Sequence, residues 1–174
     1  MKGKRYNLIL EIGCSYGFAL PSLCQLSDRV IGTDVEGTFN FCRDLTLLDI
    51  QKNHPNLELS AANVYELSKV IEPNSCDVIL AFSMLEHFPS NHGKALSEVY
   101  ACLKSGGVFI CELPSENWLY KLGRKLTRYQ EAHKNYDYNT LRNLLRDFFK
   151  EVKIMNSPFG IPLFKIGVYE KDSR

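Results

Sequence analysis

Residues 8–18 read Leu-Ile-Leu-Glu-Ile-Gly-Cys-Ser-Tyr-Gly-Phe, and this stretch decides the predicted fold. An apolar run ends in the carboxylate Glu11, and Gly13 and Gly17 bracket a tight turn before a new apolar segment. The pattern is typical of a buried parallel strand that delivers backbone N–H groups and a helix N-terminus to a ligand. A second apolar run ends in Asp34, about 20 residues after Gly13, where a ribose-binding acid belongs. Together the two runs predict a nucleoside-cofactor site.

The bulk properties predict one domain that spans residues 1–174. The net charge is +1 and charges of both signs are mixed along the chain, so no basic face for duplex nucleic acid is expected. No apolar run is long enough to span a bilayer, and the segment after the basic start is too short for a signal peptide. These features favour a cytoplasmic protein.

The six cysteines stand at positions 14, 24, 42, 76, 102 and 111, with no C-x-x-C pair among them. Most lie inside apolar segments, where a thiol behaves as a small hydrophobic side chain. We therefore expect reduced core cysteines and no metal site. Cys14 differs, because its place in the turn brings its backbone close to the ligand.

Short apolar runs alternate with longer amphipathic ones along the chain, which predicts a parallel sheet with right-handed crossovers. Apolar residues recur at helical spacing in the second predicted helix (Phe41, Leu45 and Leu48), with Thr38 as a candidate N-cap. The expected strands are 6–12, 30–34, 57–61, 76–82 and 108–113, and the expected helices are 18–26, 38–54 and 93–103.

The last third of the chain predicts a different arrangement. Residues 117–129 and 140–149 have helical patterns, and 151–156 and 163–170 have strand patterns. The short link between those two strands permits a hairpin and no helical crossover. The expected fold is an α/β doubly wound sheet of seven strands, mostly parallel, with an antiparallel C-terminal hairpin.

Five stretches together resemble the class I S-adenosylmethionine-dependent methyltransferases, in particular the type 11 small-molecule group that includes ubiquinone-biosynthesis enzymes. They are residues 10–17, 30–34, 63–67, 76–88 and 103–110. The resemblance implies a Rossmann-like fold with a core at 6–114, an acceptor-side lid at about 115–139, and a C-terminal helix and hairpin at 140–171. It implies methyl transfer from S-adenosyl-L-methionine to an oxygen or carbon of a small-molecule or lipid-like acceptor, with S-adenosyl-L-homocysteine as the product.

The resemblance also implies the cofactor-binding residues. Gly13 and Gly17 let the backbone approach the cofactor closely, and the helix after Gly17 offers N–H groups to the methionine carboxylate. Asp34 can accept both ribose hydroxyls. Ser15 departs from the family pattern, which usually has glycine there; a serine fits with a negative φ, or with modest strain otherwise. The other expected contacts are Glu11 and the Ser83 carbonyl to the ammonium, the Cys14 backbone, Asn63 to the adenine edge, and Val64 as an apolar wall.

Acceptor-side candidates follow the fourth strand and the fifth. His87 suits deprotonation of a hydroxyl, although a histidine hydrogen-bonded inside a helix start fits equally well. His133 is a second candidate base, and Glu86, Trp118 and Tyr136 are candidate acceptor contacts. The basic amphipathic stretch 118–129 suits either a membrane surface, an anionic or lipid-like acceptor, or a lid with a solvated face.

Several alternatives stay open at this stage. Asp34 would also serve as a helix N-cap, and Glu11 as a salt-bridged strand end. The Y-x-x-x-K pairs at 65–69 and 100–104 allow an NAD(P)-dependent short-chain oxidoreductase, and the G-x-S-x-G match around Ser15 weakly suggests a hydrolase elbow. A methyltransferase-like binding or regulatory subunit without turnover is a further candidate. The short segment before the first strand suggests an open pocket, a homodimer whose second copy covers it, or a shortened reading frame.

Overall fold

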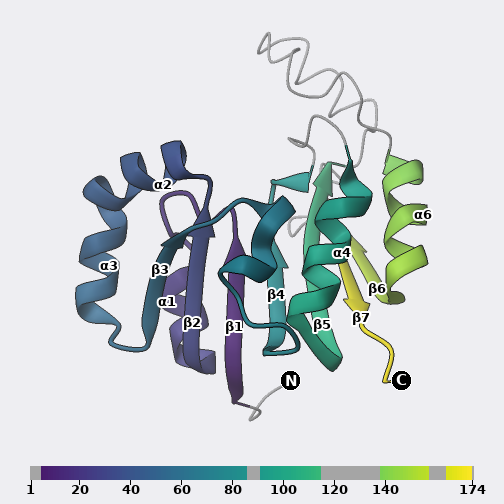
Figure 1. Ribbon diagram of the computed structural model, residues 1–174, viewed down its shortest axis with the longest axis horizontal. Coiled ribbons are helices and arrows are strands. Elements are labelled where there is room, and N and C mark those ends of the chain that lie inside the picture. The colour runs from purple at the N-terminus through teal and green to yellow at the C-terminus, as the bar shows by residue number, and fades with distance from the viewer. Residues whose placement is uncertain (1–4, 86–90, 115–137, 157–163, 174) are drawn as a thin grey trace, which may run out of the picture.

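The computed structural model describes residues 5–85, 91–114, 138–156 and 164–173 (Figure 1). Its centre is a seven-stranded sheet with the order β3-β2-β1-β4-β5-β7-β6. The strands are β1 (Tyr6–Ile12), β2 (Ser27–Asp34), β3 (Leu57–Ala61), β4 (Cys76–Ala81), β5 (Leu103–Pro114), β6 (Lys150–Asn156) and β7 (Phe164–Glu170).

The strand directions confirm the predicted fold class. β1 pairs in parallel with both β2 and β4, so that Ile9 lies opposite Val30 on one side and Val78 on the other. β2 with β3 and β4 with β5 are also parallel pairs. β7 is antiparallel to both of its neighbours, β5 and β6, which is the predicted C-terminal hairpin. The carboxyl ends of β1 to β5 therefore meet at one edge of the sheet.

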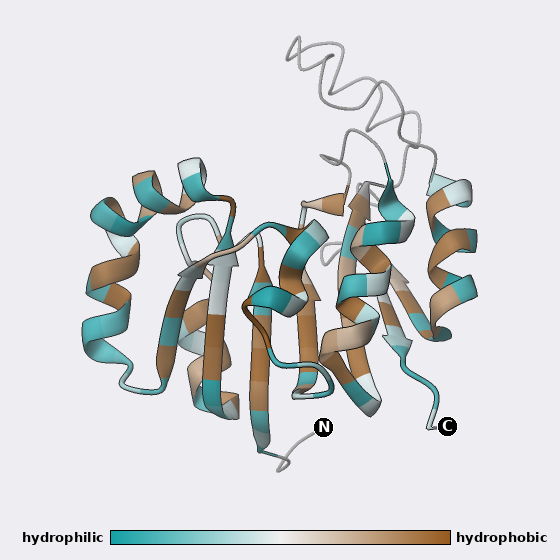
Figure 2. Cartoon of the chain, in the orientation of Figure 1, coloured by the Kyte–Doolittle hydropathy of each residue, from teal (hydrophilic) through white to brown (hydrophobic). Residues whose placement is uncertain are grey.

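Helices pack on both faces of the sheet. They are α1 (Leu20–Leu26), α2 (Glu36–Cys42), the π-helical η1 (Arg43–Leu47), α3 (Leu48–Asn53), the 3₁₀-helical η2 (Val64–Lys69), α4 (His92–Cys102) and α6 (Tyr138–Phe148). Figure 1 shows η2, α4 and α6 in front of the sheet and α1 behind it. Each face has its own apolar core: Leu8 and Leu10 of β1 pack towards η2 and α4, while Ile9 packs towards α1. The strands are accordingly the most hydrophobic part of the chain (Figure 2).

Two element boundaries differ from the prediction by more than two residues. β2 begins at Ser27, three residues early, where the Arg5 and Asn56 side chains donate to the Ser27 carbonyl and the Ser27 hydroxyl donates to the Arg29 carbonyl. β5 begins at Leu103, five residues earlier than predicted, and runs through Gly106 and Gly107. Gly106 has φ +72 and its N–H donates to the Lys171 carbonyl, so these glycines bend a strand.

The segment predicted as one helix over 38–54 is three helical pieces, and its exposed face was predicted wrongly. The first piece begins at Glu36 with Val35 at the N-cap, so Thr38 caps nothing. Phe41, Leu45 and Leu48 are exposed. Cys42 and Leu47 are buried instead, and their five-residue spacing matches the i→i+5 closure of the π-helix between them.

None of the described helices combines the length and the hydropathy that a membrane crossing requires. The predicted helix at 117–129 lies outside the described residues, as does nearly all of the predicted lid.

Candidate functional site

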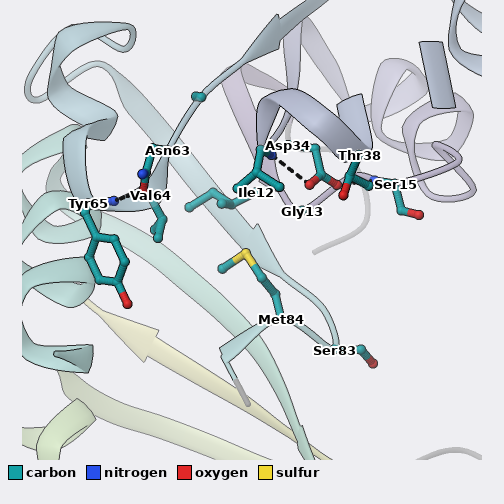
Figure 3. A pocket seen from close by; sticks show the side chains of 12 residues that line it. Ile12, Gly13, Ser15, Asp34, Thr38, Asn63, Val64, Tyr65, Ser83 and Met84 are labelled. Carbon is teal, nitrogen blue, oxygen red and sulfur yellow. Dashed lines mark hydrogen bonds between the residues drawn. The ribbon is translucent and has the colours of Figure 1, made fainter. Parts of the chain in front are cut away.

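A cavity of about 510 Å³ lies where the carboxyl ends of β1 to β4 meet. Each of these strands contributes its last residue or residues that closely follow it. Figure 3 shows Asn63 and Tyr65 at one end of the cavity, Met84 in the middle and Ser83 at the other end. The complete lining is Ile12, Gly13, Ser15, Asp34, Val35, Thr38, Ala62, Asn63, Val64, Tyr65, Ser83 and Met84.

The glycine turn shapes the cavity by its backbone. Gly13 and Gly17 both have positive φ, +74 and +76, which glycine adopts without a steric penalty. The N–H groups of Gly13 and Cys14 donate to the Thr33 carbonyl and so attach the turn to β2. A Cβ on Gly13 would lie 3.0 Å from the Met84 Sδ, so this glycine keeps the cavity open beside β4.

Ser15 has φ +46, the conformation that the sequence analysis marked as strained for a serine. Its N–H donates to the Asp34 Oδ2 at 2.9 Å, and this charge-assisted hydrogen bond helps to hold the left-handed conformation.

The Asp34 carboxylate is fixed by backbone donors. Its Oδ1 accepts from the Val35 N–H at 2.8 Å, and its Oδ2 accepts from Ser15. The helix N-cap alternative is wrong, because Val35 is the N-cap of α2 and no side chain caps this helix. An ionised carboxylate has about four acceptor positions, so further hydrogen bonds to a ligand are available.

Glu11 is a buried acid at the end of β1, only 5% exposed. Within the described part of the chain its Oε2 has no hydrogen-bond partner, and no salt bridge forms there. Burial first, and then the nearby Asp34 charge, raise the pKa of Glu11 from 4.5 to about 7. The salt-bridged alternative is therefore not supported, and an ammonium group would find an unsatisfied carboxylate oxygen here.

The opposite end of the cavity is built by the first turn of η2. The Asn63 Oδ1 accepts from the Tyr65 N–H at 3.0 Å, which orients the side-chain amide. Val64 is buried behind it. Tyr65 lines the cavity, a role that the sequence analysis did not assign to it. The signal was its position two residues after a strand-end polar residue.

The dehydrogenase alternative finds no support in the lysines of the two Y-x-x-x-K pairs. Lys69 makes an exposed ion pair with Glu66. Lys104 pairs with Asp77, which lies at the amino end of β4, away from the cavity.

Three expected cofactor residues do not line the cavity: Glu11, Cys14 and Gly17. The Cys14 side chain is buried, and burial first of all raises the pKa of its thiol to about 12. The helix after Gly17 starts only at Leu20 and contains Pro21, which has no N–H. The Leu20 N–H donates to the Gly17 carbonyl, so the expected N–H cradle for a carboxylate is reduced.

Beyond β4, Ser83 and Met84 close the cavity. Ser83 has φ +45 and its Oγ donates to the Glu112 Oε2 at 2.7 Å. Glu112 sits on β5, and sequence reasoning missed it because it lies within an apolar strand next to no recognised motif. The predicted residues Glu86, His87, Trp118, His133 and Tyr136 all lie outside the described residues. All six cysteines are free and buried, as predicted.

The sheet order and the cavity at its carboxyl edge define a nucleoside-binding type of α/β domain. Comparison with known families specifies which one. The family model described as "Methyltransferase domain" matches residues 10–111, which is more than half of the chain. The chain belongs to this methyltransferase-domain family.

Similar curated proteins carry methyltransferase names. A protein of Mycolicibacterium smegmatis, named an S-adenosylmethionine-dependent methyltransferase, is 27% identical over 107 residues, 62% of this chain and 38% of that protein. The ubiquinone biosynthesis O-methyltransferase of Albidiferax ferrireducens is 32% identical over 102 residues, 57% of this chain and 38% of its own length. The matched region thus spans about two fifths of these relatives.

Solved structures share the fold at low identity. A chain in the complex of the Haloferax volcanii Trm112 methyltransferase activator superposes with a TM-score of 0.77 at 14% identity, covering 99% of this chain and 85% of that one. The Burkholderia thailandensis 1,6-didemethyltoxoflavin-N1-methyltransferase, solved with S-adenosylhomocysteine, gives a TM-score of 0.72 at 17% identity, with 98% and 72% coverage. These likenesses confirm the predicted Rossmann-like fold.

Proposed function

We propose that this chain binds S-adenosyl-L-methionine and transfers its methyl group to an oxygen or carbon of a small-molecule or lipid-like acceptor. The observation that carries the proposal is the Asp34 carboxylate, which two backbone N–H groups hold at the wall of the cavity. A carboxylate fixed at the end of the second strand, next to a glycine turn, suits a ribose diol.

The residues present fit this cofactor in size and polarity. A cavity of about 510 Å³ lies within the range of small-molecule sites. Asp34 would hold the ribose, the Asn63 amide would face the adenine edge, and Val64 would pack against the ring. Glu11, with its unsatisfied buried oxygen, would meet the ammonium directly or through a water molecule. The Ser83 carbonyl is a second candidate for the ammonium.

Methyl transfer from a sulfonium requires the protein mainly to position the acceptor relative to the methyl group. When bound, S-adenosylmethionine supplies a methyl group already activated by its sulfonium. The chain's own task is to align the acceptor atom with that methyl group and to exclude water. A base is needed only for an acceptor that carries a proton at pH 7, and His87 and His133 are proposed for that role. Glu86, Trp118 and Tyr136 are proposed to contact the acceptor.

Family membership supports methyl transfer, and the names of the relatives favour oxygen as the acceptor atom. Four of the curated relatives are ubiquinone biosynthesis O-methyltransferases, which gives a lipid-like acceptor its support. The basic stretch 118–129 fits such an acceptor or a membrane surface.

Equilibrium binding tests the proposal. Calorimetric titration with S-adenosylhomocysteine should show binding to the wild-type chain, and Asp34→Ala should weaken it by about 1.5–3 kcal/mol, or about 10- to 150-fold. Asp28→Ala is the matched control, because Asp28 begins the same strand and makes only an exposed ion pair with Arg5. Unchanged affinity in Asp34→Ala would remove this residue from the ribose site.

Parallel titrations separate the alternatives. Binding of NADH in place of S-adenosylhomocysteine would favour the oxidoreductase. Binding of S-adenosylhomocysteine without turnover of any acceptor in a broad panel would favour a regulatory subunit. If His87 is a base, His87→Ala should lower turnover more than cofactor affinity, with a changed pH–rate profile.

A further inference from the structure

The end of the cavity remote from Asn63 holds a pair of polar side chains, Ser83 and Glu112, of which the cofactor proposal uses only the Ser83 backbone carbonyl. Ser83 lines this end, and Figure 3 shows its side chain directed away from Asn63 and Tyr65. The Ser83 Oγ donates to the Glu112 Oε2 at 2.7 Å, across the gap between the ends of β4 and β5. The carboxylate thus lies one hydrogen bond from the cavity wall.

Strand geometry fixes the side of the sheet from which Glu112 reaches Ser83. Its neighbours Cys111 and Leu113 are buried in the core under α4 and α6, so Glu112 projects to the other face. On that face its cross-strand partner on β7 is Ile166. Lys165, one residue earlier, lies opposite Leu113 and places its ammonium over the Tyr138 ring. The nearest β7 lysine therefore does not neutralise Glu112.

The hydrogen-bonding capacity of Glu112 is mostly unused. Within the described residues its only recorded hydrogen bond is the one from Ser83, and that bond occupies a single acceptor position on Oε2. A carboxylate has about four such positions and no donor. The Ser83 hydroxyl gives its proton to Glu112, so only its lone pairs remain for a further hydrogen bond. Both groups at this end consequently favour a ligand that donates hydrogen bonds.

We propose that Glu112 is the residue that selects the methyl acceptor, and that Ser83 positions its carboxylate. The acceptor class it fits carries an ammonium or hydroxyl donor and no carboxylate near the reacting group, because an anion would meet a negative charge that no described residue neutralises. This inference rests on the proposed function, since the other end of the cavity must hold the nucleoside part of the cofactor for this end to receive the acceptor.

Three catechols of different charge test the proposal on the protein saturated with S-adenosylhomocysteine. Dopamine carries an ammonium, catechol is neutral, and 3,4-dihydroxybenzoate carries a carboxylate. We expect ligand-observed NMR titrations to give dopamine an affinity about tenfold higher than that of 3,4-dihydroxybenzoate, with catechol between them. Glu112→Gln should bring the two charged probes within about twofold of each other. Glu112→Asp should retain the preference for dopamine.

Glu170→Gln is the matched control, because Glu170 lies on the same face at the far end of β7, opposite Val108. It should keep the wild-type preference. Ser83→Ala should weaken dopamine binding while the preference for a cation remains, as a positioning role requires.

An equal preference in Glu112→Gln and the wild type would overturn the inference, as would failure of all three catechols to bind a chain that holds S-adenosylhomocysteine. Failure to bind S-adenosylhomocysteine itself would overturn the proposed function, and this inference with it. Cofactor affinity in each variant also shows whether the fold is retained.

Discussion

Replacing Glu11 by glutamine should change how stability depends on pH. Burial and the Asp34 charge raise the pKa of Glu11 from 4.5 to about 7 in the folded chain. The folded state therefore holds this proton more tightly than the unfolded state does. The resulting stabilisation is complete below pH 4.5 and is lost as the pH rises through 7. Each pKa unit corresponds to about 1.4 kcal/mol. Between pH 4.5 and pH 8, the free energy of unfolding of the wild type should therefore fall by about 3 kcal/mol relative to that of Glu11→Gln.

Urea unfolding at a series of pH values measures this difference. Glu36→Gln is the control, because Glu36 is an exposed carboxylate in the first turn of α2 and should leave the pH profile unchanged. Using the difference between two variants removes the contributions of all other titrating groups. A constant difference between wild type and Glu11→Gln from pH 4.5 to pH 8 would refute the buried, unpaired state of this carboxylate.

The same carboxylate should connect pH to ligand binding. A ligand ammonium beside Glu11 favours the ionised form of this carboxylate, so binding offsets part of the free-energy cost of burying its charge. The thermal stabilisation by S-adenosylhomocysteine should then be larger at pH 8 than at pH 5.5 in the wild type. In Glu11→Gln this pH difference should vanish. A pH-independent shift in both proteins would place the ammonium elsewhere.

Three further substitutions test the structure by urea unfolding. Gly17→Ala should lower the free energy of unfolding by about 2–4 kcal/mol, because φ is +76 and the new Cβ would lie 2.7 Å from the Leu47 Cδ2. An unfolding midpoint equal to that of the wild type would contradict this expectation. Ser15→Gly should raise the free energy of unfolding by about 0.5–1 kcal/mol, because glycine adopts a φ of +46 without strain. A lower free energy of unfolding would show that the serine side chain stabilises the turn. Glu151→Gln should cost about 1 kcal/mol at pH 7, where Arg142 binds the carboxylate at 2.7 Å. Hydrogen bonds from Arg142 above all lower the pKa of Glu151 to about 2, so that cost should shrink as the pH falls from 4.5 towards 2.

The sequence predicted the central strands β1 and β4 well because each contains a nearly continuous apolar run. Buried parallel strands lose backbone hydrogen bonds or core contacts if they shift, so their limits coincide with changes of composition. The limits of β1 and β3 were predicted to the residue. The antiparallel hairpin was predictable from the short link before β7. The order of the strands was not predicted, because it depends on crossovers that pass over several neighbours.

The helical segment after β2 shows where pattern reading failed. Apolar residues at α-helical spacing normally mark the buried face. Here the chain closes one π-turn between Arg43 and Leu47, and the buried positions Cys42 and Leu47 are five residues apart. Phe41 lies 61% exposed, with its ring centroid 6.4 Å from that of Tyr16. No local sequence signal distinguishes a π-turn from an α-turn, so the exposed face could not be inferred.

The residues of the candidate site differ in whether the sequence alone could identify them. Asp34, Asn63 and the glycine turn were predictable because each follows a strand at a family motif. Glu112 was not, because its role arises from Ser83 approaching it across two strand ends, a relation of tertiary structure. Likewise Thr38, read as a cap, and Tyr65, read as part of a dehydrogenase pair, both line the cavity.

Residues other than glycine with a positive φ mark the positions in the described chain where the backbone conformation is strained. Four non-glycine residues have positive φ there: Ser15, Asn74, Ser83 and Asn91. Asparagine tolerates this conformation better than serine does; Asn74 lies in a turn and Asn91 is the N-cap of α4. Both serines line the cavity, and each has one hydrogen bond to a carboxylate that offsets the strain, Ser15 to Asp34 and Ser83 to Glu112. Because such strain persists only where the surroundings enforce it, Asp34 and Glu112 are held by the same device: a strained serine that donates a hydrogen bond to the acid.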